Sequence, residues 1–72
     1  MISKSNFRII EKYVFLGDIR YRIAIIGTNI IFNVKASNEE EALEKASEIA
    51  EKMGLNDDTI ELIREKYKEK SR

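Results

Sequence analysis

The sequence has 72 residues and contains no cysteine, histidine, proline or tryptophan. Without cysteine the chain has no disulfide, no thiolate nucleophile and no thiolate ligand for a structural zinc ion. Without histidine it has no side chain whose unperturbed charge changes near neutral pH, and no imidazole ligand. These absences predict a domain that is not an enzyme and that holds no cofactor and no metal ion.

Long apolar runs are missing as well. No stretch approaches the roughly 18 to 20 apolar residues that are needed to cross a bilayer. The first four residues, Met1 to Lys4, do not lead into the apolar segment of a secretory signal. Gly17 and Gly27 have the positions of hairpin glycines and belong to no phosphate-binding loop. We therefore expect a cytoplasmic protein with no membrane partner and no small-molecule substrate.

Charged and apolar residues are both abundant in a chain that has room for a single domain, residues 1–72. Hydrophobic residues make up 43% of the sequence and charged residues 36%, which is too apolar for a disordered chain. The net charge is zero, but residues 1–37 carry six basic and two acidic side chains, a net +4, whereas residues 38–72 carry seven and eleven, a net −4. The basic first half weakly indicates an anionic partner.

The first half of the chain has the pattern of three antiparallel strands. Its β-branched and aromatic residues predict strands at about 7–16, 19–26 and 30–36, with glycine-containing turns between them. Gly17-Asp18 matches a two-residue hairpin turn of type II′, in which glycine comes first. Gly27-Thr28-Asn29 marks the second turn.

The second half changes to helical periodicity. Ser37 and Asn38 are both suitable N-caps with a glutamate three residues later, and they begin a helix predicted at about 38–53. Gly54 has the position of a left-handed C-cap. The segment from Asp58 to Glu61 has the pattern of a capping box for a second helix at about 58–69.

These elements predict a two-layer α+β fold in the order β-β-β-α-α, in which a three-stranded antiparallel meander carries both helices on one face. The turn positions pair Val14 with Tyr21, and Arg22 with Lys35. The covered face is then expected to contain the following side chains: Ile10, Val14, Leu16, Ile19, Tyr21, Ile23, Ile25, Ile30, Phe32, Val34 and Ala36. A slip of one residue would exchange the two faces of a strand, and the adjacent Ile9 and Ile10 leave the register of the first strand open.

The open face, opposite the helices, is the candidate functional surface. It combines aromatic, cationic and apolar residues, namely Tyr13, Phe15, Arg20, Arg22, Ile31, Asn33 and Lys35. Aromatic residues and arginine are enriched in protein–protein contacts, and the same combination stacks bases and neutralises phosphates in single-strand binders. A simply solvated face is a third interpretation, but it leaves several large apolar groups in water. The like charges of Arg22 and Lys35 are expected to face each other across the strands, which is destabilising unless an anion binds there or Glu11 screens the pair.

Two further patterns indicate no function. The glutamates between Glu39 and Glu51 are expected to form the solvated outer side of the first helix and not a catalytic cluster. The segment from Phe32 to Ala42 resembles the strand-to-helix passage of double-stranded-RNA-binding domains, and also that of an archaeal large-subunit ribosomal protein. The RNA-binding family, however, has a helix before its strands and a basic start to the following helix, where this chain is acidic.

The sequence therefore predicts a small non-enzymatic interaction module. We expect it to bind a protein partner, or a second copy of itself as a homodimer, through the open sheet face or the edge of the third strand. A regulatory or inhibitory protein of a microbe or its virus would fit this description. Two alternatives stay open, namely nucleic-acid binding, to RNA or a single strand, by the basic and aromatic sheet face, and a thermostable de novo designed scaffold without a function.

Overall fold

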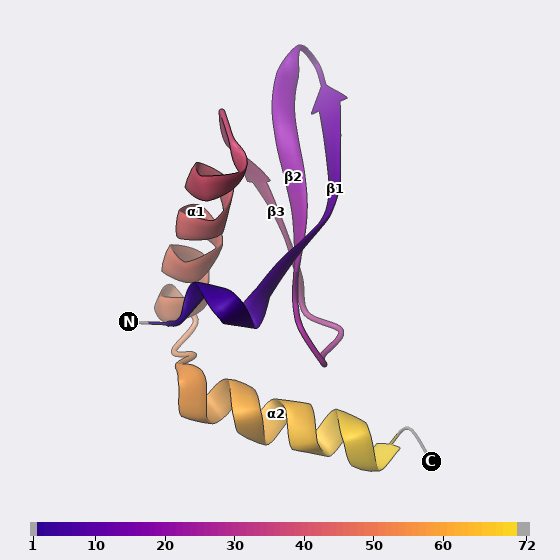
Figure 1. The fold of residues 1–72 in the computed structure, drawn as a ribbon, viewed down its shortest axis with the longest axis vertical. Coiled ribbons are helices and arrows are strands. Elements are labelled where there is room, and N and C mark those ends of the chain that lie inside the picture. The colour runs from indigo at the N-terminus through magenta and orange to yellow at the C-terminus, as the bar shows by residue number, and fades with distance from the viewer. Residues whose placement is uncertain (1, 71–72) are drawn as a thin grey trace.

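The computed structural model of the protein describes residues 2–70 and shows a three-stranded sheet followed by two helices (Figure 1). The elements occur in the order η1 (Lys4–Asn6, a 3-10 turn), β1 (Phe7–Phe15), β2 (Asp18–Ile25), β3 (Ile31–Lys35), α1 (Glu39–Lys52) and α2 (Asp57–Lys70). The strands pair antiparallel in the order β1-β2-β3. The predicted α+β class, with its meander sheet and two following helices, is confirmed.

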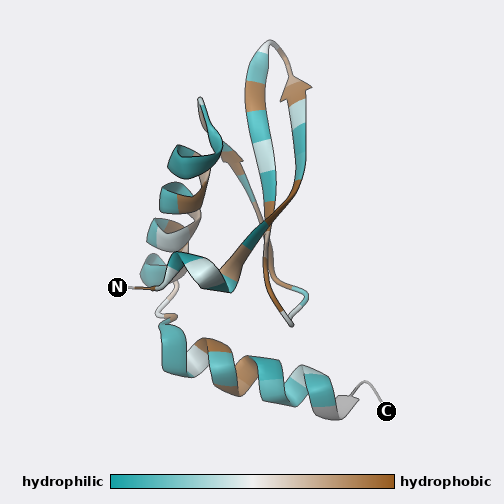
Figure 2. Ribbon diagram, in the orientation of Figure 1, coloured by the Kyte–Doolittle hydropathy of each residue, from teal (hydrophilic) through white to brown (hydrophobic). Residues whose placement is uncertain are grey.

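Helix α1 lies beside the sheet and contributes small side chains to the core. Ala42, Ala46 and Ala50 recur at intervals of four residues, share one face of the helix and are fully buried. The sheet side of the core is formed by larger side chains, those of Phe7, Tyr21, Ile23, Ile25, Phe32, Val34 and Ala36. The outer side of α1 is hydrophilic (Figure 2). Alternate residues of β2 and β3 are therefore buried as predicted.

The first hairpin turns at Leu16-Gly17, one residue earlier than predicted. Both residues have a positive φ, 51° at Leu16 and 82° at Gly17, as a type I′ turn requires. The type II′ turn predicted at Gly17-Asp18 is therefore wrong. The ladder moves with the turn, so that Val14 pairs with Ile19, two residues away from its predicted partner. Because the shift is even, side chains near the turn keep their predicted faces.

A bulge in β1 changes the faces of the residues before it. Ile9 pairs with Ile23 and Glu11 with Arg22, which leaves Ile10 as an extra residue between them. Ile9, which the predicted alternation places opposite Ile10 and therefore on the open face, consequently packs against the core. Ile10, expected on the covered face, is half exposed. Both predictions are wrong, because hydrophobic alternation does not reveal where a residue is inserted.

The turn between β2 and β3 is held by Thr28. Its hydroxyl donates to the carbonyl oxygen of Ile25 at 2.9 Å and accepts from the backbone N–H of Ile30 at 3.1 Å. Gly27, at the start of this turn, has a φ of 81°. The hydroxyl thus provides two of the hydrogen bonds that close the turn.

The register of β2 and β3 is also displaced by two residues. Arg22 pairs with Asn33, and Arg20 is the residue that lies opposite Lys35. The predicted pair of Arg22 with Lys35 is therefore wrong. As in the first hairpin, the even displacement leaves the two faces of the strands as predicted.

Helix α1 has the ends that its sequence predicts. The Asn38 side chain accepts a hydrogen bond from the backbone N–H of Glu41 at 2.8 Å, which identifies Asn38 as the N-cap. At the other end Gly54 has a φ of 83°, and the N–H of Leu55 donates to the carbonyl of Ala50 at 3.0 Å. This pattern is a Schellman motif, and the predicted glycine stop is confirmed.

Helix α2 begins differently from the prediction. Its N-terminus is closed by a reciprocal pair, in which the N–H of Thr59 donates to the Asn56 side chain at 2.9 Å and the N–H of Asn56 donates to the Thr59 hydroxyl at 2.7 Å. The capping box predicted from Asp58 to Glu61 is therefore wrong. The observed cap, Asn56, lies two residues before Asp58. Its partner is Thr59, three residues later, whose hydroxyl accepts the second hydrogen bond of the pair.

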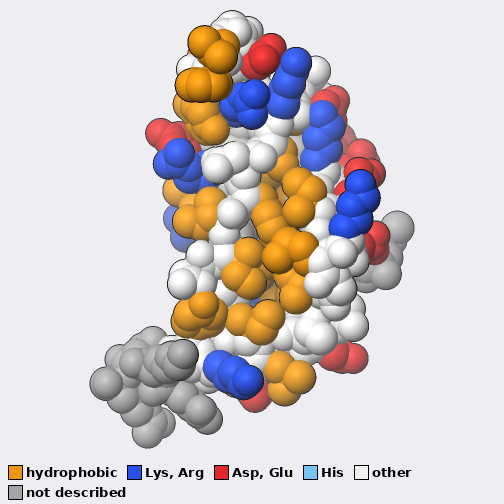
Figure 3. Space-filling view, turned by 180° about the vertical axis from the view of Figure 1, so that it is seen from behind, with side chains coloured by type: hydrophobic (Ala, Val, Ile, Leu, Met, Phe, Trp, Pro, Cys, Tyr) orange, Lys and Arg blue, Asp and Glu red, His pale blue; other side chains and the backbone are white. Residues whose placement is uncertain are grey.

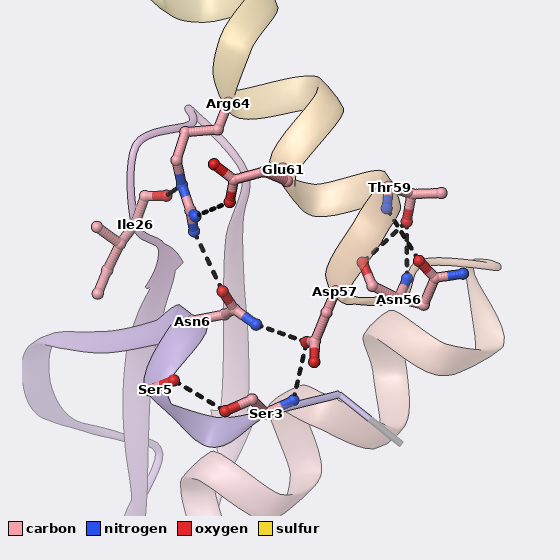
Figure 4. Close-up of polar contacts among 9 residues, drawn as sticks. All are labelled: Ser3, Ser5, Asn6, Ile26, Asn56, Asp57, Thr59, Glu61 and Arg64. Atoms are coloured by element: carbon pink, nitrogen blue, oxygen red, sulfur yellow. Dashed lines mark hydrogen bonds and ion pairs between the residues drawn. The ribbon is translucent and has the colours of Figure 1, made fainter.

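Helix α2 crosses the end of the sheet that lies away from the first hairpin turn (Figure 1). The Arg64 Nε donates to the Ile26 carbonyl at 2.7 Å, and its Nη2 donates to the Asn6 side chain at 3.2 Å (Figure 4). Asp57 accepts from the backbone N–H of Ser3 at 3.0 Å and from the Asn6 amide at 2.8 Å. Asn6 thus connects the beginning of the chain to two residues of α2, Asp57 and Arg64. The buried Ile60 supplies the apolar part of the contact between α2 and the rest of the domain.

Candidate interaction surface

The seven residues predicted as a binding surface lie together on the open face of the sheet. The ladder places them in successive rows, with Phe15 nearest the hairpin turn, then Tyr13 with Arg20 and Lys35, then Arg22 with Asn33, and finally Ile31 beside Ala24. All of them alternate along their strands with residues of the opposite face. The sequence thus grouped these seven residues on one face correctly, although it assigned the wrong neighbours among them.

Arg22 is the centre of one row of contacts. Its guanidinium forms an ion pair with Glu11 at 3.0 Å and lies over the Tyr13 ring, 5.5 Å from the ring centroid. Its Nε donates to the Asn33 side-chain oxygen at 3.4 Å, and the Tyr13 hydroxyl donates to the same oxygen at 3.5 Å. Arg22 therefore has three partners within its own sheet, namely Glu11, Tyr13 and Asn33.

The neighbouring row contains two cations that face each other. Arg20 lies over the Phe15 ring, 5.6 Å from its centroid, and Lys35 forms an ion pair with Asp18 at 3.2 Å. Asp18 therefore offsets the like charges of this cross-strand pair. The Nε of Arg20 is buried and has no hydrogen-bond partner among the described residues.

These contacts limit what the open face can do chemically. Single-strand binders offer free aromatic rings to the bases and free cations to the phosphates. Here an arginine lies over one face of each of the two rings, Tyr13 and Phe15, and carboxylates pair with Arg22 and Lys35. A nucleic acid would first have to displace these internal partners, so the face is poorly prepared to bind one.

The outer edge of β3 is unpaired among the described residues. The N–H of Ile25 donates to the Ile30 carbonyl and the N–H of Ala36 donates to the Ile19 carbonyl, so the even-numbered residues of this segment turn their backbone groups toward β2. Backbone groups alternate in direction along an antiparallel strand. The outward groups therefore belong to Ile31, Asn33 and Lys35, and we call them the β3 edge.

The two edges of the sheet differ in regularity. β1 carries the bulge at Ile10, an irregularity that disrupts pairing along an edge. β3 has no bulge in its ladder, and the chain has no proline. At the β3 edge the Lys45 Nζ donates to the Lys35 carbonyl. β3 is therefore the more regular of the two edges.

Helix α1 flanks the β3 edge on the covered side of the sheet. Lys45 also forms an ion pair with Glu41 at 3.3 Å, and both residues lie beside Lys35 and Ala36 at the end of β3. β3 is drawn behind β2 in Figure 1, and the view from behind shows hydrophobic side chains gathered along the middle of the molecule, with cationic side chains above them and along one side (Figure 3).

The exposed hairpin tip was missed by the sequence analysis. The helices were expected to cover Val14, Leu16 and Ile19. Val14 is instead 70% exposed and Leu16 87% exposed, and Ile19 is exposed as well. The hairpin extends past the start of α1, which leaves the tip uncovered (Figure 1). No signal in the sequence marks this, because the relative lengths of hairpin and helix become relevant only when the two pack together.

Neither a metal centre nor a membrane span is present in the part of the chain that the structure describes. Residues 2–70 contain no three His, Cys, Asp or Glu side chains placed to hold a metal ion. No helix among them is both long and apolar enough to cross a bilayer. Comparisons with protein-family models, with curated proteins and with solved structures found no match to this chain.

Proposed function

We propose that the protein is a non-enzymatic interaction module that binds an extended protein segment, from a partner or from a second copy, as a fourth strand beside β3. The observation that carries this proposal is the regular, unpaired β3 edge. Backbone hydrogen bonds along such an edge supply affinity, and alternate side chains supply specificity. The half-exposed Ile31 favours an apolar side chain on the added segment, and the nearby cations favour an acidic one.

The contacts of the open face favour a protein partner over nucleic acid. An arginine lies over one face of each aromatic ring, and two of the three cations have carboxylate partners within the sheet, whereas strand addition uses the β3 edge, which pairs with no other described strand. An inert designed scaffold is also less consistent with the molecule. Designers avoid exposed apolar groups and non-glycine residues at positive φ, and Leu16 has both features. We place the module in the cytoplasm, as its composition predicts.

The test compares two substitutions at the same position. Asn33→Pro removes an outward N–H of the β3 edge without removing a hydrogen bond to β2, because proline is tolerated at such positions of edge strands. Asn33→Ala removes the side chain and keeps the N–H. The probe is a displayed library of random peptides, selected on the wild-type domain, and circular dichroism verifies the fold of both variants. We expect the selected peptides to bind the Ala variant and not the Pro variant.

Amide hydrogen exchange provides a second readout. The N–H groups of Ile31, Asn33 and Lys35 should exchange rapidly in the free domain and become protected when a selected peptide binds. Equal peptide binding by the Pro and Ala variants would contradict strand addition. Salt-sensitive binding of single-stranded oligouridine, with no peptide selected, would favour the nucleic-acid alternative.

A further inference from the structure

We propose that the tip of the first hairpin inserts into an anionic membrane surface, with Val14, Phe15 and Leu16 in the bilayer interface. This inference goes beyond the proposed function, because the tip contains no residue of β3. The sequence led us to expect no membrane partner, since it has no apolar segment long enough to cross a bilayer. Insertion of a hairpin tip into one leaflet does not require such a segment.

The tip is apolar on both faces of the hairpin. Phe15 lies on the open face of the sheet, whereas Val14 and its cross-strand partner Ile19 lie on the opposite face. Leu16 is in the turn itself. All four side chains are exposed, because the hairpin extends past the start of α1 (Figure 1). A flat protein surface would cover one face of this wedge, whereas a lipid layer surrounds both faces.

The turn residue Leu16 indicates that the apolar tip has a use. Its φ of 51° is a conformation that glycine and asparagine adopt more readily than leucine. Its side chain is 87% exposed and gains little from burial within the domain. Neither the local backbone nor packing therefore favours leucine at this position, and strained residues of this kind point to a function. Contact with an apolar medium outside the domain would offset both costs.

A band of cations follows the apolar tip along the hairpin. The next two rows of the ladder contain three cations and no carboxylate, and we call Lys12, Arg20 and Lys35 the cationic band. Arg20 lies over the Phe15 ring, which puts its guanidinium at the border of the apolar tip. Figure 3 shows hydrophobic side chains at the upper end of the molecule with cationic side chains directly below them. Cations at this level fit the headgroups of an anionic leaflet.

The length of the tip fits the depth of a bilayer interface. Leu16 is three residues beyond Tyr13, which corresponds to about 10 Å along an extended strand. Interfacial elements bury their apolar groups about 5 to 10 Å deep, and tyrosine is enriched at the headgroup level. Asp18 is the only carboxylate of residues 14–19, and it pairs with Lys35 of the cationic band at 3.2 Å. The acidic start of α1 lies further from the tip and stays in water (Figure 1).

The experiment measures cosedimentation at low salt with vesicles of phosphatidylcholine and phosphatidylserine in a two-to-one ratio. The wild-type domain should bind these vesicles, and should bind pure phosphatidylcholine much more weakly. Leu16→Asn should lower the partition coefficient at least about tenfold, and Lys12→Gln should lower it about fivefold. The matched controls Leu62→Asn and Lys66→Gln change exposed residues of α2 and should leave binding unchanged. Circular dichroism verifies that each variant is folded.

The absence of tryptophan allows a direct readout of insertion. Phe15→Trp places a single indole at the tip, and Leu62→Trp places one on α2. On addition of the anionic vesicles, the emission of the tip indole should shift to the blue and be quenched by lipids with brominated acyl chains. The indole on α2 should show neither effect, because α2 lies at the other end of the molecule (Figure 1).

The outcomes distinguish this inference from the proposed function. A wild-type domain that does not bind the anionic vesicles, or a Leu16→Asn variant that binds as strongly as the wild type, would overturn membrane insertion. If the domain ignores vesicles but a selected peptide loses affinity for Leu16→Asn, the tip contacts a protein and the membrane proposal is wrong. Strand addition is tested independently, by peptide binding to Asn33→Pro and Asn33→Ala in the absence of lipid.

Discussion

The side chain of Arg64 lies directly against Gly27, so that a Cβ at position 27 would be 2.7 Å from the Arg64 Cγ. The contact is close because the Arg64 Nε donates to the carbonyl of Ile26, the residue before the glycine. Gly27 also has a φ of 81°, a conformation that other residues rarely adopt. One glycine therefore allows both the turn between β2 and β3 and the attachment of α2.

Gly27→Ala should lower the free energy of unfolding by about 2 kcal/mol or more, because strain at positive φ adds to the displacement of Arg64. Gly17→Ala is the matched control, since Gly17 has nearly the same φ, 82°, and no atom within 4 Å of an added Cβ. It should cost only about 1 kcal/mol. Chemical denaturation measures both values, and equal losses would show that the Arg64 contact contributes nothing.

Leu16→Asn should stabilise the protein, by about 0.5 to 1 kcal/mol. Leu16 has a φ of 51° and is 87% exposed, so its side chain gains little from burial while its backbone is strained. Asparagine adopts this left-handed conformation more readily. Val14→Asn is the control, because Val14 is also exposed but has no positive φ. Thermal denaturation should show a gain for the first variant only, and a loss for Leu16→Asn would mean that the turn is not strained.

Asn38→Ala should lower the stability by about 1 kcal/mol, because the side chain satisfies the backbone N–H of Glu41 at the start of α1. The sequence alone left Ser37 as an equally suitable cap. No hydrogen bond from the Ser37 side chain is present among the described contacts, so Ser37→Ala should change the unfolding free energy by no more than a few tenths of a kcal/mol. The reverse order of the two losses would place the helix start one residue earlier.

The double variant Phe15→Ser with Ile31→Thr should remain folded with a loss of about 1 kcal/mol or less. Both side chains are about half exposed, at 51% and 50%, and lie on the open face. Phe32, the next residue along β3, is buried on the other face, and Phe32→Ser should cost about 3 kcal/mol or more. Urea denaturation compares the two variants, and unfolding of the double variant would mean that the open face is part of the core.

The sequence by itself determined the elements and the two faces of β2 and β3. Each strand and helix has a local signal, such as the asparagine cap at Asn38 and the glycine stop at Gly54, that acts within a few residues. The faces of β2 and β3 were predicted correctly although both registers were displaced, because side chains alternate with a period of two and the displacement was two. The open-face residues were therefore grouped correctly before their neighbours were known.

Only the tertiary structure decided which residues are neighbours and which are covered. Arg22 meets Asn33 and not Lys35 because the second turn, which Thr28 closes, sets the register of β2 and β3. Which residues are covered depends on how the sheet packs against α1. The same packing buries Ile9 and leaves the hairpin tip in solvent, and Arg64 finds the Ile26 carbonyl at a sequence separation of 38 residues. Such contacts depend on how separate elements fit together, which no local pattern in the chain encodes.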